Sequence, residues 1–172
     1  MYDEGRYFQI IMFEGVQEFK EQIKADHLKK KELINMTFSD DNSSLLEEAI
    51  AQRKVLIANY LLDAGAPVNV ITKEHYNEFH IIAPYLSNDS MVAVAERILK
   101  KGCDLSLQDK KYYNTAMFSI ALSILTHQTH DNMLFLKKCL AMNQGIHEKN
   151  IRGLCVVDLL KQFNQAELVM ET

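Results

Sequence analysis

Flexible and turn-forming residues are scarce in this chain. Its 172 residues include only 6 glycines and 2 prolines, and no low-complexity tract interrupts them. This excludes a flexible linker between separate domains, and the sparse β-branched alternation argues against a substantial sheet. With 48% hydrophobic residues the chain is long enough to bury a sizeable core. We therefore expect one all-α domain spanning residues 1–172.

Cysteine pairs and long apolar runs are also missing. Cys103, Cys139 and Cys155 are an odd number without CxxC spacing, so we expect reduced, buried thiols rather than disulfides or a metal site. The mixed charge of residues 1–6 is not followed by an unbroken apolar stretch. Neither a secretory signal nor a membrane span is expected, and the prediction is a cytoplasmic protein without a membrane partner.

An excess of positive charge is absent, because 19 basic against 23 acidic residues give a net charge of −4. Binding of nucleic acid requires a basic surface that neutralises phosphates. We therefore expect no nucleic-acid partner. Local pairs such as Lys100-Lys101 and Lys137-Lys138 are interpreted as solvated helix ends.

Catalytic motifs are missing as well. The chain has no Gly-x-Ser-x-Gly elbow, no glycine-rich phosphate loop and no His-Glu-x-x-His. The paired acids Asp40-Asp41 and Glu47-Glu48 are better explained by helix starts, where acids favour the positive end of the helix dipole. The segment 41–44 is a good candidate cap for a helix that begins at Leu45. We expect no enzyme activity and no cofactor.

What the chain does contain is an internal repeat. Residues 61–69, which contain Gly65, recur as residues 98–106, which contain Gly102, at an offset of 102 − 65 = 37 residues. In each copy an apolar helical face precedes the glycine, and an extended stretch follows. Glycine is expected there because the chain leaves the helix through a left-handed conformation. A period of this size is typical of stacked helical pairs.

The repeat extends in both directions. A third unit follows if Asn143 replaces the glycine, since asparagine also tolerates left-handed geometry. Residues 1–40, with Phe8, Ile11 and Met12 on one face, are interpreted as a diverged N-terminal helical pair. The repeats are placed at 41–74, 75–110 and 111–150, with a shortened capping unit at 151–172. Extra residues near 87–90 and 126–131 predict longer helices in the later repeats.

These residues carry a resemblance to a known family. Residues 65–69, Gly-Ala-Pro-Val-Asn, are similar to the Gly-Ala-Asp-Val-Asn run of ankyrin repeats, and Phe79-His80 resembles the Leu-His pair that opens an ankyrin helix. The resemblance implies an ankyrin-like solenoid of antiparallel helix pairs with finger loops. It also implies a structural role for His80, whose family counterpart hydrogen-bonds neighbouring loops.

Ankyrin proteins bind partners through the finger tips and the concave helix face, so the resemblance points to two neighbouring tips of this chain. Tyrosine provides a large rigid contact area at low entropic cost, and both tips carry it. The alternative is that one tyrosine of each group packs under its loop, Tyr113 being the better candidate. The candidate partner-binding residues are Lys73, Glu74, His75, Tyr76, Glu78, Lys110, Lys111, Tyr112 and Tyr113.

Three functions are compatible with the sequence. The leading one is a non-catalytic module that binds another protein. The second is a dedicated inhibitor, such as a bacterial immunity protein, whose acidic balance would suit a basic toxin. The third is a metal-dependent enzyme. The spacing that would support it is that of His127 and His130, three residues apart beside Asp131, which can place two imidazoles on one helical face as zinc ligands. Because no third ligand is fixed by sequence, that segment is better interpreted as a solvated turn.

Overall fold

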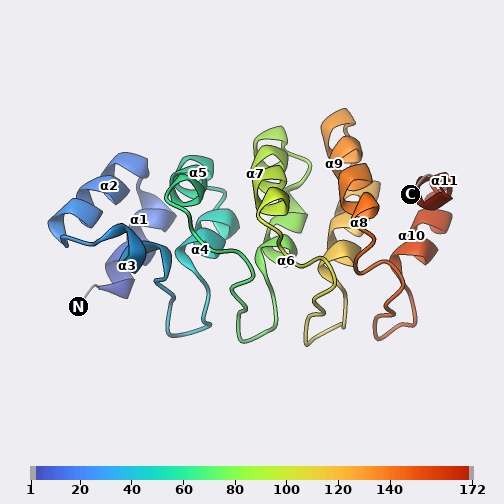
Figure 1. Cartoon of the computed structure of the whole chain (residues 1–172), viewed down its shortest axis with the longest axis horizontal. Coiled ribbons are helices and arrows are strands. Elements are labelled where there is room, and N and C mark those ends of the chain that lie inside the picture. The colour runs from blue at the N-terminus through green and yellow to red at the C-terminus, as the bar shows by residue number, and fades with distance from the viewer. Residues whose placement is uncertain (1–2, 171–172) are drawn as a thin grey trace.

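The computed structural model describes residues 3–170, and within this range it contains helices and loops but no β-strand. The all-α prediction is confirmed. Figure 1 shows the helices arranged in a row, with loops projecting on one side. The helices are α1 (Glu4–Phe13), α2 (Val16–Ala25), α3 (Lys30–Ile34), α4 (Leu45–Ala51), α5 (Val55–Asp63), α6 (Glu78–Ile82), followed by the 3-10 turn η1 (Ala83–Tyr85), then α7 (Asp89–Lys100), α8 (Ala116–Thr126), α9 (His130–Ala141), α10 (Val156–Gln162) and α11 (Glu167–Met170).

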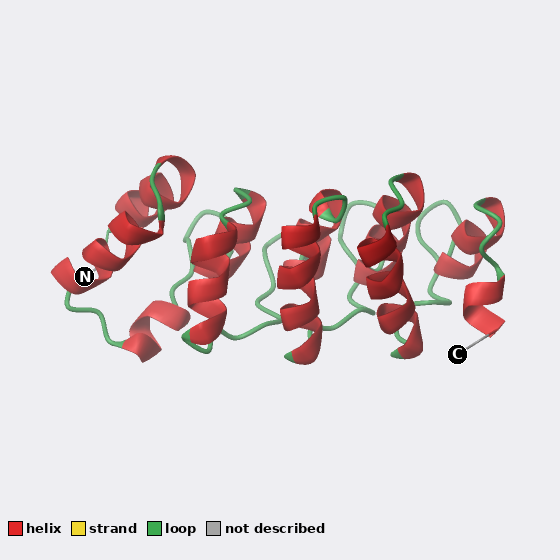
Figure 2. Cartoon of the chain, turned by 90° about the horizontal axis from the view of Figure 1, so that it is seen from above, coloured by secondary structure: helices red, strands yellow, loops and turns green. Residues whose placement is uncertain are grey.

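The helices form two layers. One layer runs through α1, α4, α6, α8 and α10, each in contact with the next, and the other runs through α2, α5, α7, α9 and α11. Consecutive helices pair across the layers, and Figure 2 shows the pairs side by side. The core lies between the layers and between neighbouring pairs, and its largest fully buried rings are those of Tyr7, Phe19, Phe79 and Phe135.

Helix ends follow the local chemistry of the sequence. Gly65, Gly102 and Asn143 have φ values of 89°, 80° and 52°, so the predicted left-handed exits are confirmed. At the start of α4, the Ser44 hydroxyl accepts from the backbone N of Glu47 at 3.1 Å, and the Glu47 carboxylate accepts from the backbone N of Ser44 at 2.7 Å. This reciprocal pair is a capping box, and the predicted cap is confirmed.

Later pairs are longer than the first repeat. Helices α4 and α5 have 7 and 9 residues, whereas α8 and α9 have 11 and 12. The predicted lengthening is confirmed for α7, α8 and α9, but it is wrong for α6, which has only 5 residues and continues as the 3-10 turn η1. Pro84 lies in that turn and cannot donate the backbone hydrogen bond that a longer α-helix would need. The polar residues of the insertion, including Ser87 and Asn88, lie exposed before α7.

The N-terminal region differs from the prediction. A short additional helix, α3, follows the pair α1–α2. Of the apolar face expected for this region, Ile11 is buried but Phe8 is 37% exposed, while Tyr7 and Ile10 are fully buried. Tyr7 occupies the core because its hydroxyl donates to Asp26 at 2.9 Å, which satisfies the polar end of a buried ring. The buried face of α1 is therefore rotated by about one residue relative to the expectation.

All three cysteines are buried and carry free thiols. Burial raises the pKa of the Cys103 and Cys139 thiols, which favours the neutral, unreactive form. In the described part of the chain, each helix is too short or too polar to cross a lipid bilayer.

Candidate interaction surface

Four loops project on the same side of the row and join α3 to α4, α5 to α6, α7 to α8 and α9 to α10 (Figure 1). We call these loops, residues 35–44, 64–77, 101–115 and 142–155, finger loops 1 to 4. The candidate residues chosen from the sequence lie in finger loops 2 and 3, apart from Glu78 at the start of α6. The surface is therefore built from loops held by the helix row.

Each finger loop turns in the same way before the helix that follows. The residue two positions before the helix N-cap has a positive φ in every case: Asn42 (65°), His75 (61°), Tyr113 (54°) and Gly153 (74°). Only one of the four is glycine. Sequence reasoning missed this repeated feature because non-glycine residues seldom adopt a left-handed conformation.

Neighbouring finger loops are connected by backbone hydrogen bonds. One amide in each of finger loops 2, 3 and 4 donates to a carbonyl of the preceding loop: Lys73 N to Asp41 O (2.8 Å), Lys110 N to Glu74 O (3.1 Å) and Ile151 N to Tyr112 O (2.9 Å). Each such bond stabilises the loops by about 1 kcal/mol. The tips are therefore held in a fixed order along the row.

Two of the candidate lysines contribute to the same connection. The Lys73 ammonium donates to the carbonyls of Ser39 (3.0 Å) and Asp40 (2.6 Å), and the Lys110 ammonium donates to the carbonyl of Lys73. These side chains are exposed, but their donors are directed at the preceding loop. Their main role in the structure is to fix the loops.

His80 has the structural role that the resemblance implied. One ring nitrogen lies 3.2 Å from the Asn114 carbonyl of finger loop 3, and the other interacts with Asn77 at the start of α6. The Asn77 amide donates to the Asp104 carbonyl at 2.7 Å. Burial lowers the pKa of His80, so the ring is neutral at physiological pH.

Seven of the nine candidate residues are exposed, Tyr76 is half-buried, and Glu78 is fully buried. The Tyr76 ring packs on His80 with its centroid 5.4 Å away. Tyr113 does not pack under its loop, because it is 53% exposed and Tyr112 is 45% exposed. The Lys111 ammonium lies 4.9 Å from the centre of the Tyr112 ring. Finger loop 3 thus presents two tyrosines and a lysine together.

The inclusion of Glu78 in the contact surface was wrong. Its carboxylate accepts from the Asn69 backbone N at 2.9 Å and from the Cys103 thiol at 3.3 Å. These partners belong to finger loops 2 and 3, so they could not be inferred from residues adjacent to Glu78 in the sequence. Its second carboxylate oxygen has no hydrogen-bond partner within residues 3–170, and burial raises the pKa of the group.

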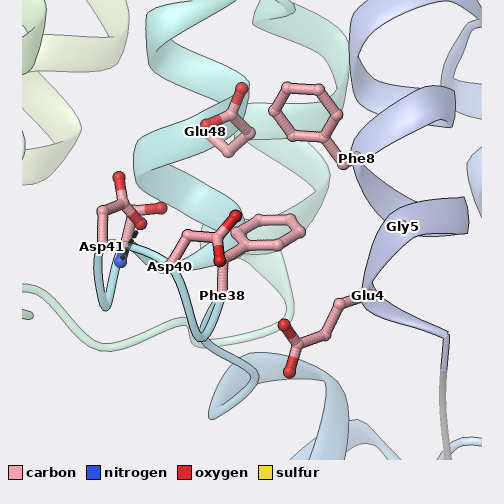
Figure 3. Close-up of a pocket in the computed structure, with 8 residues that line it drawn as sticks. Glu4, Gly5, Phe8, Phe38, Asp40, Asp41 and Glu48 are labelled. Carbon is pink, nitrogen blue, oxygen red and sulfur yellow. Dashed lines mark hydrogen bonds between the residues drawn. The ribbon is translucent and has the colours of Figure 1, made fainter.

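A pocket of about 420 Å³ lies where finger loop 1 meets α1 and α4 (Figure 3). Sequence reasoning missed it, since Asp40-Asp41 was assigned only to a helix start and Phe8 only to the apolar face of a helix. The available signal was the acidic pair Asp40-Asp41 at the tip of finger loop 1, because the tips of finger loops 2 and 3 carry lysine. The pocket is lined by Glu4, Gly5, Phe8, Phe38, Asp40, Asp41, Ser43 and Glu48.

The histidine pair considered for zinc lies at two helix ends, where His127 is the C-cap of α8 and His130 is the first residue of α9. His127 and His130 are both exposed there. Within residues 3–170, no three His, Cys, Asp or Glu side chains come close enough together to hold a metal ion.

Comparison with known proteins adds information on the fold. No protein-family model matches the chain, and no curated protein matches its sequence. The chain is similar in structure to a functionally unknown protein from Leptotrichia buccalis C-1013-b, with a TM-score of 0.70 and 17% sequence identity over 95% of this chain and 88% of that one. At this identity the likeness concerns the fold alone.

Proposed function

We propose that this chain is an ankyrin-like repeat protein that binds another protein through its finger loops and the adjoining helix face, without catalysing a reaction. The observation that carries the proposal is the exposed group of Lys111, Tyr112 and Tyr113 on a finger loop whose backbone is already ordered. Asp109, 3% exposed, accepts from the backbone N of Lys111 at 2.8 Å and of Tyr112 at 2.6 Å. Because the loop is preformed, association loses little further conformational entropy.

Tyrosines in such a position are typical binding hot spots. The test replaces Tyr112 with Ser and Tyr113 with Asn, which tolerates the left-handed φ of that position. The full-length protein serves as bait for affinity purification from its native source, with quantitative mass spectrometry. We expect one protein to be depleted by at least about tenfold relative to wild type, which corresponds to 1.4 kcal/mol.

The matched control is Leu56→Ser, which removes a 67% exposed side chain at the start of α5, outside the finger loops. The control should retain the captured protein. If the tyrosine variant also retained every protein captured by wild type, the proposed surface would be wrong.

A dedicated inhibitor is the second candidate, and the acidic pocket beside finger loop 1 favours it. Four carboxylates line this pocket, which suits a basic partner such as a nuclease toxin. An activity assay on the captured protein, with and without this chain, separates an inhibitor from a general adaptor.

A further inference from the structure

The pocket beside finger loop 1 combines acidic and aromatic side chains from three segments. Helix α1 provides Glu4 and Phe8, finger loop 1 provides Phe38, Asp40, Asp41 and Ser43, and α4 provides Glu48. Figure 3 shows the Phe8 and Phe38 rings and the Asp40 and Glu48 side chains around the same space. Among residues 3–170, no basic side chain lines it. The pocket is therefore shaped for a positively charged group.

The acids of this pocket have no ionic partner in the described part of the chain. The ion pairs there join Arg6 to Glu14, Arg97 to Asp63 and Lys138 to Glu96. The nearby Lys73 ammonium donates to backbone carbonyls of Ser39 and Asp40. Burial, and the charge of Asp41, raise the pKa of the Glu48 carboxyl. A bound cation would relieve this unbalanced negative charge.

Ser43 provides a second, independent feature. The residue is only 4% exposed and lines the pocket. Its hydrogen bonds within residues 3–170 are made by the backbone, through N to Asp41 at 2.9 Å and through O from Phe38 at 2.8 Å. The side-chain hydroxyl makes no hydrogen bond within residues 3–170, and it is not one of the fully buried atoms without a partner there, which are Glu47 Oε1 and Glu78 Oε1. It therefore stays accessible from the pocket and is free to bond to a ligand.

The arrangement favours an extended organic cation over a metal ion. The acids do not converge as a metal site requires. The Phe8 and Phe38 rings stand at 84° with centroids 6.1 Å apart, so they form an apolar wall. A guanidinium group stacks on aromatic rings, binds carboxylates through two parallel hydrogen bonds, and is more weakly hydrated than an ammonium.

We propose that this pocket receives an arginine side chain of the partner protein. The inference rests on the proposed function and specifies the chemistry of the partner at finger loop 1. A stem of methylene groups would lie against Phe8, while the guanidinium would donate to the carboxylates of Asp40 and Glu48 and to the Ser43 hydroxyl. Citrulline, which has the same shape without the charge, would bind poorly.

The test uses the full-length, ¹⁵N-labelled protein and an acetylated, amidated Gly-Leu-Arg-Leu-Gly peptide, followed by NMR. We expect saturable shifts of the Gly5, Phe8, Ser43 and Glu48 amides. The affinity of the citrulline peptide should be at least about tenfold weaker, and that of the lysine peptide intermediate. Shifts that do not saturate, or equal affinity for the citrulline peptide, would refute the assignment.

Matched variants separate the pocket from the overall charge of the protein. Asp40→Asn with Glu48→Gln removes two pocket charges, and the glutamine keeps the oxygen that accepts from Gln52 at 2.9 Å. The control, Glu21→Gln with Asp131→Asn, removes two charges from exposed residues of α2 and α9. We expect arginine-peptide binding to weaken at least about fivefold in the first variant and to stay within about twofold in the second.

Equal weakening in both variants would mean general electrostatic attraction only and would overturn the assignment. Thermal unfolding of both variants verifies that they are folded. If the peptide fails to bind while the tyrosine variant still loses its captured partner, the arginine pocket is wrong and the proposed function stands. If the peptide binds but the tyrosine variant keeps every partner, the surface on finger loop 3 is wrong instead.

Discussion

Glu47 is a buried acid whose ionisation should control the pH dependence of stability. It is 0% exposed, and one carboxylate oxygen has no hydrogen-bond partner in the described part of the chain. Burial raises the pKa of Glu47 from 4.5 to about 8, against the opposing hydrogen bond from Ser44, and the charge of Glu78 raises it further. The group is therefore protonated in the native protein at neutral pH.

The sign of the effect follows from proton binding. Between pH 4.5 and about 8, the native Glu47 carboxyl keeps its proton while the unfolded chain releases it. The unfolded state binds fewer protons, so the free energy of unfolding falls as the pH rises through this window. At pH 7 the pH is about 2.5 units above the pKa of the unfolded chain. At about 1.4 kcal/mol per unit, the free energy of unfolding is about 3 kcal/mol lower than at a pH below that pKa.

The perturbation that tests this is Glu47→Gln, which is neutral at every pH and keeps an oxygen to accept from the backbone N of Ser44. Urea unfolding followed by circular dichroism between pH 5 and 8 gives the free energy of unfolding of both proteins. We expect the difference between variant and wild type to grow with pH, by about 2 to 3 kcal/mol between pH 5 and pH 7.

The exposed variant Glu21→Gln is the control, and its stability curve should run parallel to that of wild type. If the curves of Glu47→Gln and wild type were parallel, the constant difference in the free energy of unfolding would reflect packing alone. That result would refute the reasoning, because it would mean that the native carboxyl is already ionised at pH 5.

Three further predictions concern the loops and the core. His80→Ala removes the contact with the Asn114 carbonyl and should lower the free energy of unfolding by about 1 to 3 kcal/mol, measured by urea unfolding. Gly145→Ala should lower the free energy of unfolding by about 3 kcal/mol, because the φ of Gly145 is +67° and the new Cβ would lie 2.4 Å from the Leu105 carbonyl oxygen. The control Gly102→Ala has open space around the new Cβ and should lower it by about 1 kcal/mol in the same assay. The fully buried Cys139 thiol should react with Ellman's reagent only in unfolding concentrations of denaturant, and rapid reaction of the native protein would contradict this.

Helix boundaries were predictable where short-range chemistry decides them. Gly65 and Gly102 follow the ends of their helices because each glycine itself adopts the left-handed conformation that a helix exit needs, at φ values of 89° and 80°. Ser44 and Glu47 are three residues apart and bond to each other, so the start of α4 could be inferred from a short stretch of sequence. Such features depend on neighbours within one helical turn.

Side-chain exposure was less predictable where a distant partner decides it. Tyr7 lies in the core because of Asp26, 19 residues away, and Glu78 is buried because it bonds to Asn69 and Cys103. A hydrophobicity pattern contains no information on such partners. The expectations for Phe8 and Glu78 failed for this reason, and the acidic pocket, which joins α1, finger loop 1 and α4, was missed for the same reason.

The connected finger loops limit what each exposed residue contributes to binding. Lys73 and Lys110 direct their ammonium groups at the preceding loop, so mutation of either would loosen the loops as well as remove a charge. A loss of binding in a Lys73 variant would therefore not identify a contact. Tyr112 and Tyr113 are better probes, since their exposed rings are outside the hydrogen bonds that join the loops.

The sign of the charge changes along the row of finger loops, and this change favours one orientation of a bound partner. Finger loop 1 carries Asp40 and Asp41 at its tip, whereas finger loop 3 carries Lys110 and Lys111 beside two tyrosines. Opposite charges at two points of a preordered surface favour a partner in one orientation, because the reversed orientation would place like charges together. On the functions proposed above, a basic group at finger loop 1 and a tyrosine contact at finger loop 3 would therefore act on the same partner in a fixed register.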